Sequence, residues 1–195
     1  MTNIFLVRHG QTEWNQQNRL QGHKNSPLTE MGRKQALKTR AALLDQTIDK
    51  AYVSPLERAQ DTLGIILEGR SIETTVSNNL KEINLGPWEG KTREETKESH
   101  PLEYDKFWNR QDQFILDGAE TYQQLQVRMT RELDAILANE QGKNILVVSH
   151  WIAIKTVIAH YTSTPISELT NMPDLQNGHF LTLKQRDGRI SVEGL

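Results

Sequence analysis

The sequence predicts an α/β fold built around a mainly parallel sheet. Short apolar runs alternate along the chain with longer segments of helical periodicity, which is the pattern of layered α/β proteins. Residues 4–7 and 145–148 are apolar almost throughout, as expected of strands that are buried on both faces. With 195 residues, of which 36% are hydrophobic, the chain is long enough for one domain with a substantial core.

Four apolar runs predict the strands of this sheet: residues 4–7, 51–53, 145–148 and 180–183. Residues 72–76 are a weaker candidate. We expect residues 190–192 to pair with the last run as an edge hairpin, because Asp187 and Gly188 form a typical two-residue turn.

Two helices are predicted in the first half of the chain. One follows a cap at Thr29 and runs to Leu44, with Leu37, Ala41 and Leu44 facing inward. The other starts at a capping box in Ser54-Pro55-Leu56-Glu57, with proline at the first helical position. Its expected inward residues are Leu56, Ala59, Leu63, Ile66 and Leu67.

The second half adds two helices and one irregular stretch. Thr121 and Gln124 suggest a capping box, followed by the inward residues Tyr122, Leu125, Met129, Leu133 and Ile136. Residues 151–161 predict a mostly buried helix. Residues 81–118 are charged, with scattered aromatics, and fit the alternation least well. We expect them to form one or two helices that stand over the sheet as a cap.

Charge and composition exclude several classes of protein. The formal net charge of -2 gives no sign of a nucleic-acid or membrane partner, and no apolar run approaches the roughly 18 residues that a membrane span needs. The lack of cysteine excludes disulfides, thiolate catalysis and cysteine-ligated zinc. No basic leader with a cleavage site is visible, so we expect a cytoplasmic protein.

Polar side chains follow three of the predicted strands at their carboxyl ends, where open α/β sheets bind ligands. The first strand leads into Arg8 and His9, and the strand at 145–148 leads into His150. The strand at 51–53 leads into Ser54 and, one helical turn later, Arg58. We therefore expect these side chains to meet in one crevice.

The types of these residues indicate phosphate chemistry. Arg8 and Arg58 could bind the oxygens of one phosphoryl group bidentately. Nearby arginines also favour the neutral form of His9, which a nucleophilic imidazole requires. Gly10 allows a tight turn and a close approach of the backbone to a ligand. Glu82 would be the natural proton donor, because repulsion from a bound phosphate favours the protonated carboxyl.

Six stretches, in order, resemble the histidine phosphatase superfamily, the phosphoglycerate-mutase-like group. They are LVRHGQTEWN, LQGHKNSPLTEMGRKQA, SPLERAQDT, LKEINLGPWEGKT, DGAETYQQL and ILVVSHW. The resemblance covers nearly the whole chain and is strongest to bacterial broad-specificity phosphatases, with alpha-ribazole phosphatases nearby. It implies a three-layer α/β/α fold, a single histidine phosphatase domain over residues 1–195, and a reaction that uses no metal or other cofactor.

The resemblance also implies roles for individual residues. His9 would become phosphohistidine, and Glu82 would protonate the leaving oxygen and later activate water. The residues that would hold the phosphoryl group are Arg8, Asn15, Arg58 and His150, and Gln21 and Gly22 match a loop that often borders the site. One position departs from the family pattern: Trp151 follows the second histidine, where the family usually has a small residue. Its indole would narrow the pocket or displace the nearby backbone.

The prediction is a metal-independent phosphatase that hydrolyses small phosphomonoesters through a phosphohistidine intermediate. Three alternatives stay open. A phosphoglycerate mutase would use the same residues and return the phosphoryl group to a second hydroxyl. A metallohydrolase would use His9, His150 and Glu82 as ligands, and a non-catalytic module would only bind a phosphorylated partner.

The sequence does not identify the physiological substrate beyond a small phosphorylated metabolite. An aromatic-lined cap would suit small hydrophobic or aromatic esters, and the candidate contacts are Trp88, Phe107, Trp108 and Phe114. A homodimer would be compatible with the sequence.

Overall fold

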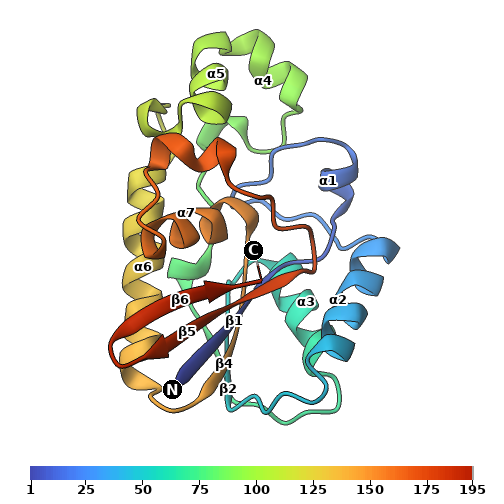
Figure 1. Ribbon diagram of the computed structural model, residues 1–195. Helices are drawn as coiled ribbons and strands as arrows, with labels where there is room; N and C mark the ends of the chain where they lie inside the picture. The colour runs from blue at the N-terminus through green and yellow to red at the C-terminus, as the bar shows by residue number, and fades with distance from the viewer. Residues whose placement is uncertain (195) are drawn as a thin grey trace.

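A computed structural model describes residues 1–194 and contains a six-stranded sheet between two layers of helices (Figure 1). The strand order is β3-β2-β4-β1-β5-β6. The first four strands in this order are parallel neighbours, and the last two add an antiparallel edge. The strands are β1 (Thr2–Arg8), β2 (Lys50–Val53), β3 (Thr74–Val76), β4 (Asn144–Ser149), β5 (Phe180–Arg186) and β6 (Arg189–Glu193). The predicted mainly parallel three-layer fold is confirmed.

Alternate residues of the central strands face two separate cores. Phe5 and Val7 of β1 pack with α3 (Glu57–Leu67) and with Leu43, which directly follows α2 (Glu30–Ala42). Ile4 and Leu6 pack with α6 (Tyr122–Asn139) and α7 (Trp151–Tyr161). Figure 1 shows α2 and α3 on one side of the sheet and α6 and α7 on the other. This double coverage explains why residues 4–7 of β1 and 145–148 of β4 are all apolar.

Most of the predicted elements form as expected. The inward residues predicted for α3 and α6 are all buried, and the capping box of Thr121 and Gln124 is present. The hairpin of β5 and β6 turns at Asp187 and Gly188, whose φ angles of 50° and 75° are both positive, as a tight two-residue hairpin loop requires. None of the helices within residues 1–194 combines the length and the apolar character that a membrane crossing needs.

The prediction for α2 was wrong about which face is buried. Leu37 and Leu44 are 47% and 65% exposed, and Ala41 is also exposed. The buried positions are instead Gly32, Ala36, Thr39 and, just after the helix, Leu43. The helix packs through small residues against the loop after β1, so closely that a Cβ on Gly10 would lie 2.5 Å from the carbonyl oxygen of Gly32. Leucines on that face would not fit.

The predicted capping box at the start of α3 does not form. The helix begins at Glu57, and Pro55 lies before it rather than at its first position. The Ser54 hydroxyl accepts a hydrogen bond from the backbone N–H of Leu56 and pairs with His150 Nε2 at 2.8 Å. Ser54 is therefore tied to the end of β4 instead of capping the helix.

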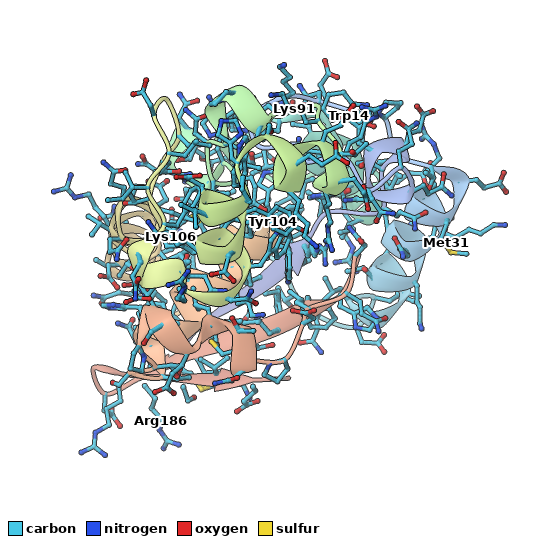
Figure 2. All side chains as sticks on the ribbon, turned by 90° about the horizontal axis from the view of Figure 1, so that it is seen from above. Trp14, Met31, Lys91, Tyr104, Lys106 and Arg186 are labelled. Carbon is cyan, nitrogen blue, oxygen red and sulfur yellow. The ribbon has the colours of Figure 1, made fainter. Side chains whose placement is uncertain are left out.

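The segment 81–118 contains two short α-helices, α4 (Arg93–Ser99) and α5 (Pro101–Asn109). Figure 1 shows both at one end of the molecule, beyond the end of β1, and Figure 2 shows them from above, in front of the strands. The remaining short elements are α1 (Glu13–Gln16), η1 (Asn78–Leu80), η2 (Gly86–Trp88), η3 (Gln111–Gln113) and η4 (Ile166–Asn171).

Candidate active site

A cavity of about 240 Å³ lies between the carboxyl ends of the central strands and helix α5. The predicted site residues that line it are Arg8, His9, Asn15, Gln21, Gly22, Arg58 and Glu82. His150 does not line the cavity but stands behind its wall, with its ring centroid 5.1 Å from that of His9. Segments that are far apart in the sequence thus converge at one place, as expected at this edge of a parallel sheet.

His9 follows β1 and is only 4% exposed. Its Nδ1 atom lies 2.7 Å from the carbonyl oxygen of Gly10, and because a carbonyl can only accept, Nδ1 must carry the proton. Burial lowers the pKa of His9 well below its usual value, and the charges of Arg58 and Arg8 lower it further. His9 is therefore a neutral imidazole whose Nε2 lone pair is free to act as a nucleophile.

His150 is fully buried between the ends of β4 and β2. Its Nε2 pairs with Ser54 Oγ, while its buried Nδ1 has no hydrogen-bond partner within the described residues. Burial and the charge of Arg58 lower the pKa of His150 well below its usual value. Its neutral ring leaves the positive charge of the site on the arginines.

Of the arginines that line the cavity, Arg8 and Arg58 place their charges nearest His9. Arg58 is 1% exposed, and its two terminal nitrogens donate to the carbonyl oxygens of Lys24 and Gly22, each at 2.7 Å. Arg8 donates to the carbonyl oxygen of Leu175 at 2.7 Å. Burial lowers the pKa of each arginine to about 10, so both remain cationic at neutral pH. The backbone contacts fix the two guanidinium groups before any ligand binds, which favours an anion of fixed geometry.

Glu82 also lines the cavity, lies before η2 in the chain, and is 9% exposed. Its carboxylate accepts three backbone hydrogen bonds, from the N–H groups of Ile83, Ile152 and Ala153. The last two belong to the first turn of α7, whose N-terminus favours a negative charge. These contacts fix the position of the carboxylate at the cavity.

The loop residues are held in different ways. Asn15 Oδ1 accepts from the backbone N–H and hydroxyl of Thr12, so the Asn15 side chain is fixed by the capping box of α1. Gln21 is 8% exposed, and its Oε1 is buried without a partner in the described part of the chain. Gly22 has a φ of +52°, and a Cβ there would lie 2.2 Å from Glu89 Oε1, so only glycine fits.

Sequence reasoning missed several residues that support or line the site. Thr62 Oγ1 accepts from the Gly10 N–H and donates to the Arg58 carbonyl, which joins the turn after β1 to α3. Asn177 Nδ2 donates to the carbonyl oxygen of His9 at 3.0 Å. Arg93 lines the cavity from α4. Thr62 follows Arg58 at helical spacing, which is a visible signal, whereas nothing local marks Asn177.

The aromatic residues proposed as ligand contacts divide into two groups. Phe107 and Trp108 line the cavity. Trp88 and Phe114 are fully buried, with ring centroids 5.5 Å apart, and belong to the core under α5. Trp151 also lines the cavity, and the Arg8 guanidinium lies 5.5 Å from the centre of its ring.

The metal-centre alternative lacks a suitable set of ligands. Within residues 1–194, no three histidine, cysteine or carboxylate side chains lie together in a way that could hold a metal ion. Arg58 instead acts on both His9 and His150, and Arg8 acts on His9 as well; these charges oppose a bound cation.

Comparison with known proteins gives consistent matches over this chain. A family model described as histidine phosphatase superfamily (branch 1) matches residues 4–195. A probable 2-carboxy-D-arabinitol-1-phosphatase of Arabidopsis thaliana is 36% identical over 148 residues, which are 75% of this chain and 30% of that protein. Phosphoglycerate mutase-like protein 4 of the same plant is 34% identical over 157 residues, 79% of this chain and 68% of that protein.

The fold also has solved counterparts. The structure of Bacillus stearothermophilus YhfR matches with a TM-score of 0.96 and 32% identity, over 98% of this chain and 95% of that one. The chain spans less than half the length of several curated relatives that it matches.

Proposed function

We propose that this chain, which belongs to the histidine phosphatase superfamily, hydrolyses small phosphate monoesters without a metal ion. The observation that carries the proposal is the neutral His9, with its Nε2 free, in a cavity that also contains the fixed cations of Arg8 and Arg58. The phosphatase name of the Arabidopsis relative supports the same chemistry.

In the proposed first step, His9 Nε2 attacks phosphorus in line with the ester bond. A nitrogen–phosphorus bond forms while the bond from phosphorus to the ester oxygen breaks, and the alcohol leaves with a proton from Glu82. Arg8, Arg58 and the Asn15 amide stabilise the charge on the non-bridging oxygens. The ring of His150, with its centroid 5.1 Å from that of His9, lies beside the nucleophile.

In the second step, water replaces the alcohol. Glu82 takes a proton from the water, and the water oxygen attacks phosphorus. The bond between phosphorus and His9 then breaks, which releases inorganic phosphate. We propose that the proton that Glu82 donates in the first step arrives with the monoanionic form of the substrate. Activity should then fall above the second pKa of a phosphate monoester, about 6.

The direct test is the release of inorganic phosphate from a panel of small phosphorylated metabolites. Wild-type protein should release phosphate in the presence of EDTA, and His9→Ala should release none above background. Equal activity of the two proteins would contradict the proposal, and loss of wild-type activity in EDTA would restore the metallohydrolase interpretation.

A phosphoglycerate mutase is the second candidate, favoured by the name of one Arabidopsis relative. Against it, the sequence after Glu82 reads INLGPW rather than the His-Tyr-Gly-like segment of cofactor-dependent mutases. Phosphate release compared with interconversion of phosphoglycerates, with and without bisphosphoglycerate, separates the two activities.

We also propose that residues 81–118 act as a cap, since Arg93, Phe107 and Trp108 from this segment line the cavity. The cytoplasmic location and the homodimer stay predictions, to be tested by cell fractionation and by light scattering.

A further inference from the structure

A second cavity lies directly beside the first. It measures about 280 Å³, and the residues that line it but not the first are Gln111, Tyr122, Lys155, Leu169 and Thr170. None of these belongs to the proposed catalytic set. For comparison, an engineered protein cavity of about 150 Å³ can bind benzene, so this second space is large enough for an aromatic ring.

Two indoles lie at the boundary between the cavities. Trp108 and Trp151 line both, with ring centroids 6.1 Å apart and planes at 32° to each other. They come from α5 and from the start of α7, which are distant in sequence. We call this pair the tryptophan wall.

Cations hold the wall on both sides. Arg8 and Lys155 lie 5.5 and 5.4 Å from the centre of the Trp151 ring, and Arg93 lies 4.4 Å from that of Trp108. Such contacts are attractive because the faces of an indole carry negative potential. Neither indole N–H has a hydrogen-bond partner in the described part of the chain, so the position of the wall depends on packing and on these cations.

We propose that Trp151 determines the size of the leaving group that the enzyme accepts. This inference rests on the proposed phosphatase function. Arg8 fixes the phosphoryl group next to Trp151, so a leaving group that extends toward α7 meets the indole instead of entering the second cavity. Wild-type enzyme therefore takes esters with short leaving groups, and a small side chain at residue 151 joins the two spaces.

The test compares two esters whose leaving groups have similar acidity and differ by one ring: phenyl phosphate and biphenyl-4-yl phosphate. The measured quantity is the ratio of kcat/KM for the larger ester to that for the smaller one. This ratio cancels any loss of activity that both esters share because Arg8 has lost its indole contact. We expect the ratio to rise about tenfold or more in Trp151→Ala, in line with the discrimination that a tight apolar wall provides.

Graded variants protect the test against a folding defect. Trp151→Phe and Trp151→Leu keep an apolar side chain at the start of α7, and the ratio should rise from Trp to Phe to Leu. Trp14→Ala is the matched control, because Trp14 lines neither cavity; Figure 2 shows it beside Lys91. A ratio that stays within twofold of wild type in the folded Trp151 variants, or that rises equally in Trp14→Ala, would overturn the proposal.

Binding separates this inference from the proposed function. Phenylphosphonate and biphenyl-4-ylphosphonate have a carbon–phosphorus bond in place of the ester linkage, so the enzyme cannot hydrolyse them. Calorimetry therefore gives their Kd values without turnover. The ratio of the two Kd values should shift in favour of the larger ligand by about tenfold or more in Trp151→Ala. An unchanged Kd ratio in a protein that still releases phosphate would overturn the role of Trp151 and leave the phosphatase function standing. A shifted Kd ratio in a protein that releases no phosphate would support the role of Trp151 and overturn the phosphatase function.

Discussion

At the scale of single residues, the proposed chemistry depends on His9 and Glu82. His9 is kept neutral by burial and by the two arginines, and its tautomer is fixed by the Gly10 carbonyl. Glu82 is held by hydrogen bonds from three backbone N–H groups. In the proposed reaction, the same cavity thus contains both the nucleophile and the group that transfers protons.

The Glu82→Gln substitution should separate proton transfer from nucleophilic attack. The new amide could keep contacts to the N–H groups of α7 through its one oxygen but could not act as an acid at the pH of the assay. We expect esters of poorly acidic alcohols to be hydrolysed about 10²- to 10⁴-fold more slowly, while activated esters such as 4-nitrophenyl phosphate lose little. Steady-state kinetics on a series of leaving groups measures this. Equal loss across the series would remove Glu82 from the role of proton donor.

At the scale of elements, α2 holds the turn after β1 by backbone-to-backbone contact, and α3 holds it through the Thr62 side chain. Gly32 of α2 lies so close to Gln11 that a Cβ would be 2.1 Å from its carbonyl oxygen. A Cβ added to Gly64 of α3 would have no neighbouring atom within 4 Å. We therefore expect opposite effects on the free energy of unfolding when each of these two glycines is replaced by alanine.

Gly64→Ala should raise the free energy of unfolding by about 1 kcal/mol, because alanine has the higher helix propensity and its methyl group would clash with no neighbouring atom. Gly32→Ala should lower it by about 1–3 kcal/mol, as overpacking does, and should also lower kcat/KM because the Gln11 backbone leads back to His9. Urea unfolding and phosphate release measure the two effects. A gain of stability in both variants would contradict the described packing of α2.

At the scale of the whole molecule, the alternation of strands and helices could be predicted from the sequence because each strand is a short apolar run with local turn signals. The buried face of α2 could not be predicted in this way, because it depends on close packing against the loop after β1 and not on the positions of the leucines. The proposed site residues could be named through resemblance, but the residues that hold them in place could not. Asn177, for example, reaches His9 across 168 residues of sequence.

The two buried histidines also make the stability of the whole fold depend on pH. The pKa values of His9 and His150 are lowered in the folded state. Below about pH 6.5 the unfolded chain takes up protons at these positions while the folded chain does not. The free energy of unfolding should therefore fall as the pH falls, by about 1.4 kcal/mol per pH unit for each histidine, until the folded pKa values are reached.

Urea unfolding between pH 7.5 and 5 measures this slope. His9→Ala should have a shallower slope than wild type, whereas His160→Ala, at an exposed position, should keep the wild-type slope. Parallel curves for wild type and His9→Ala would show that His9 is not held neutral by the fold.

The most direct measurement is the site of phosphorylation during turnover. Rapid mixing with a radiolabelled phosphate ester, followed by an alkaline quench, proteolysis and mass spectrometry, should find a base-stable, acid-labile phosphoryl group on Nε2 of His9 and none on the His9→Ala protein. A phosphoryl group on any other residue, or turnover that passes through no phosphorylated protein at all, would contradict the proposed function of the cavity.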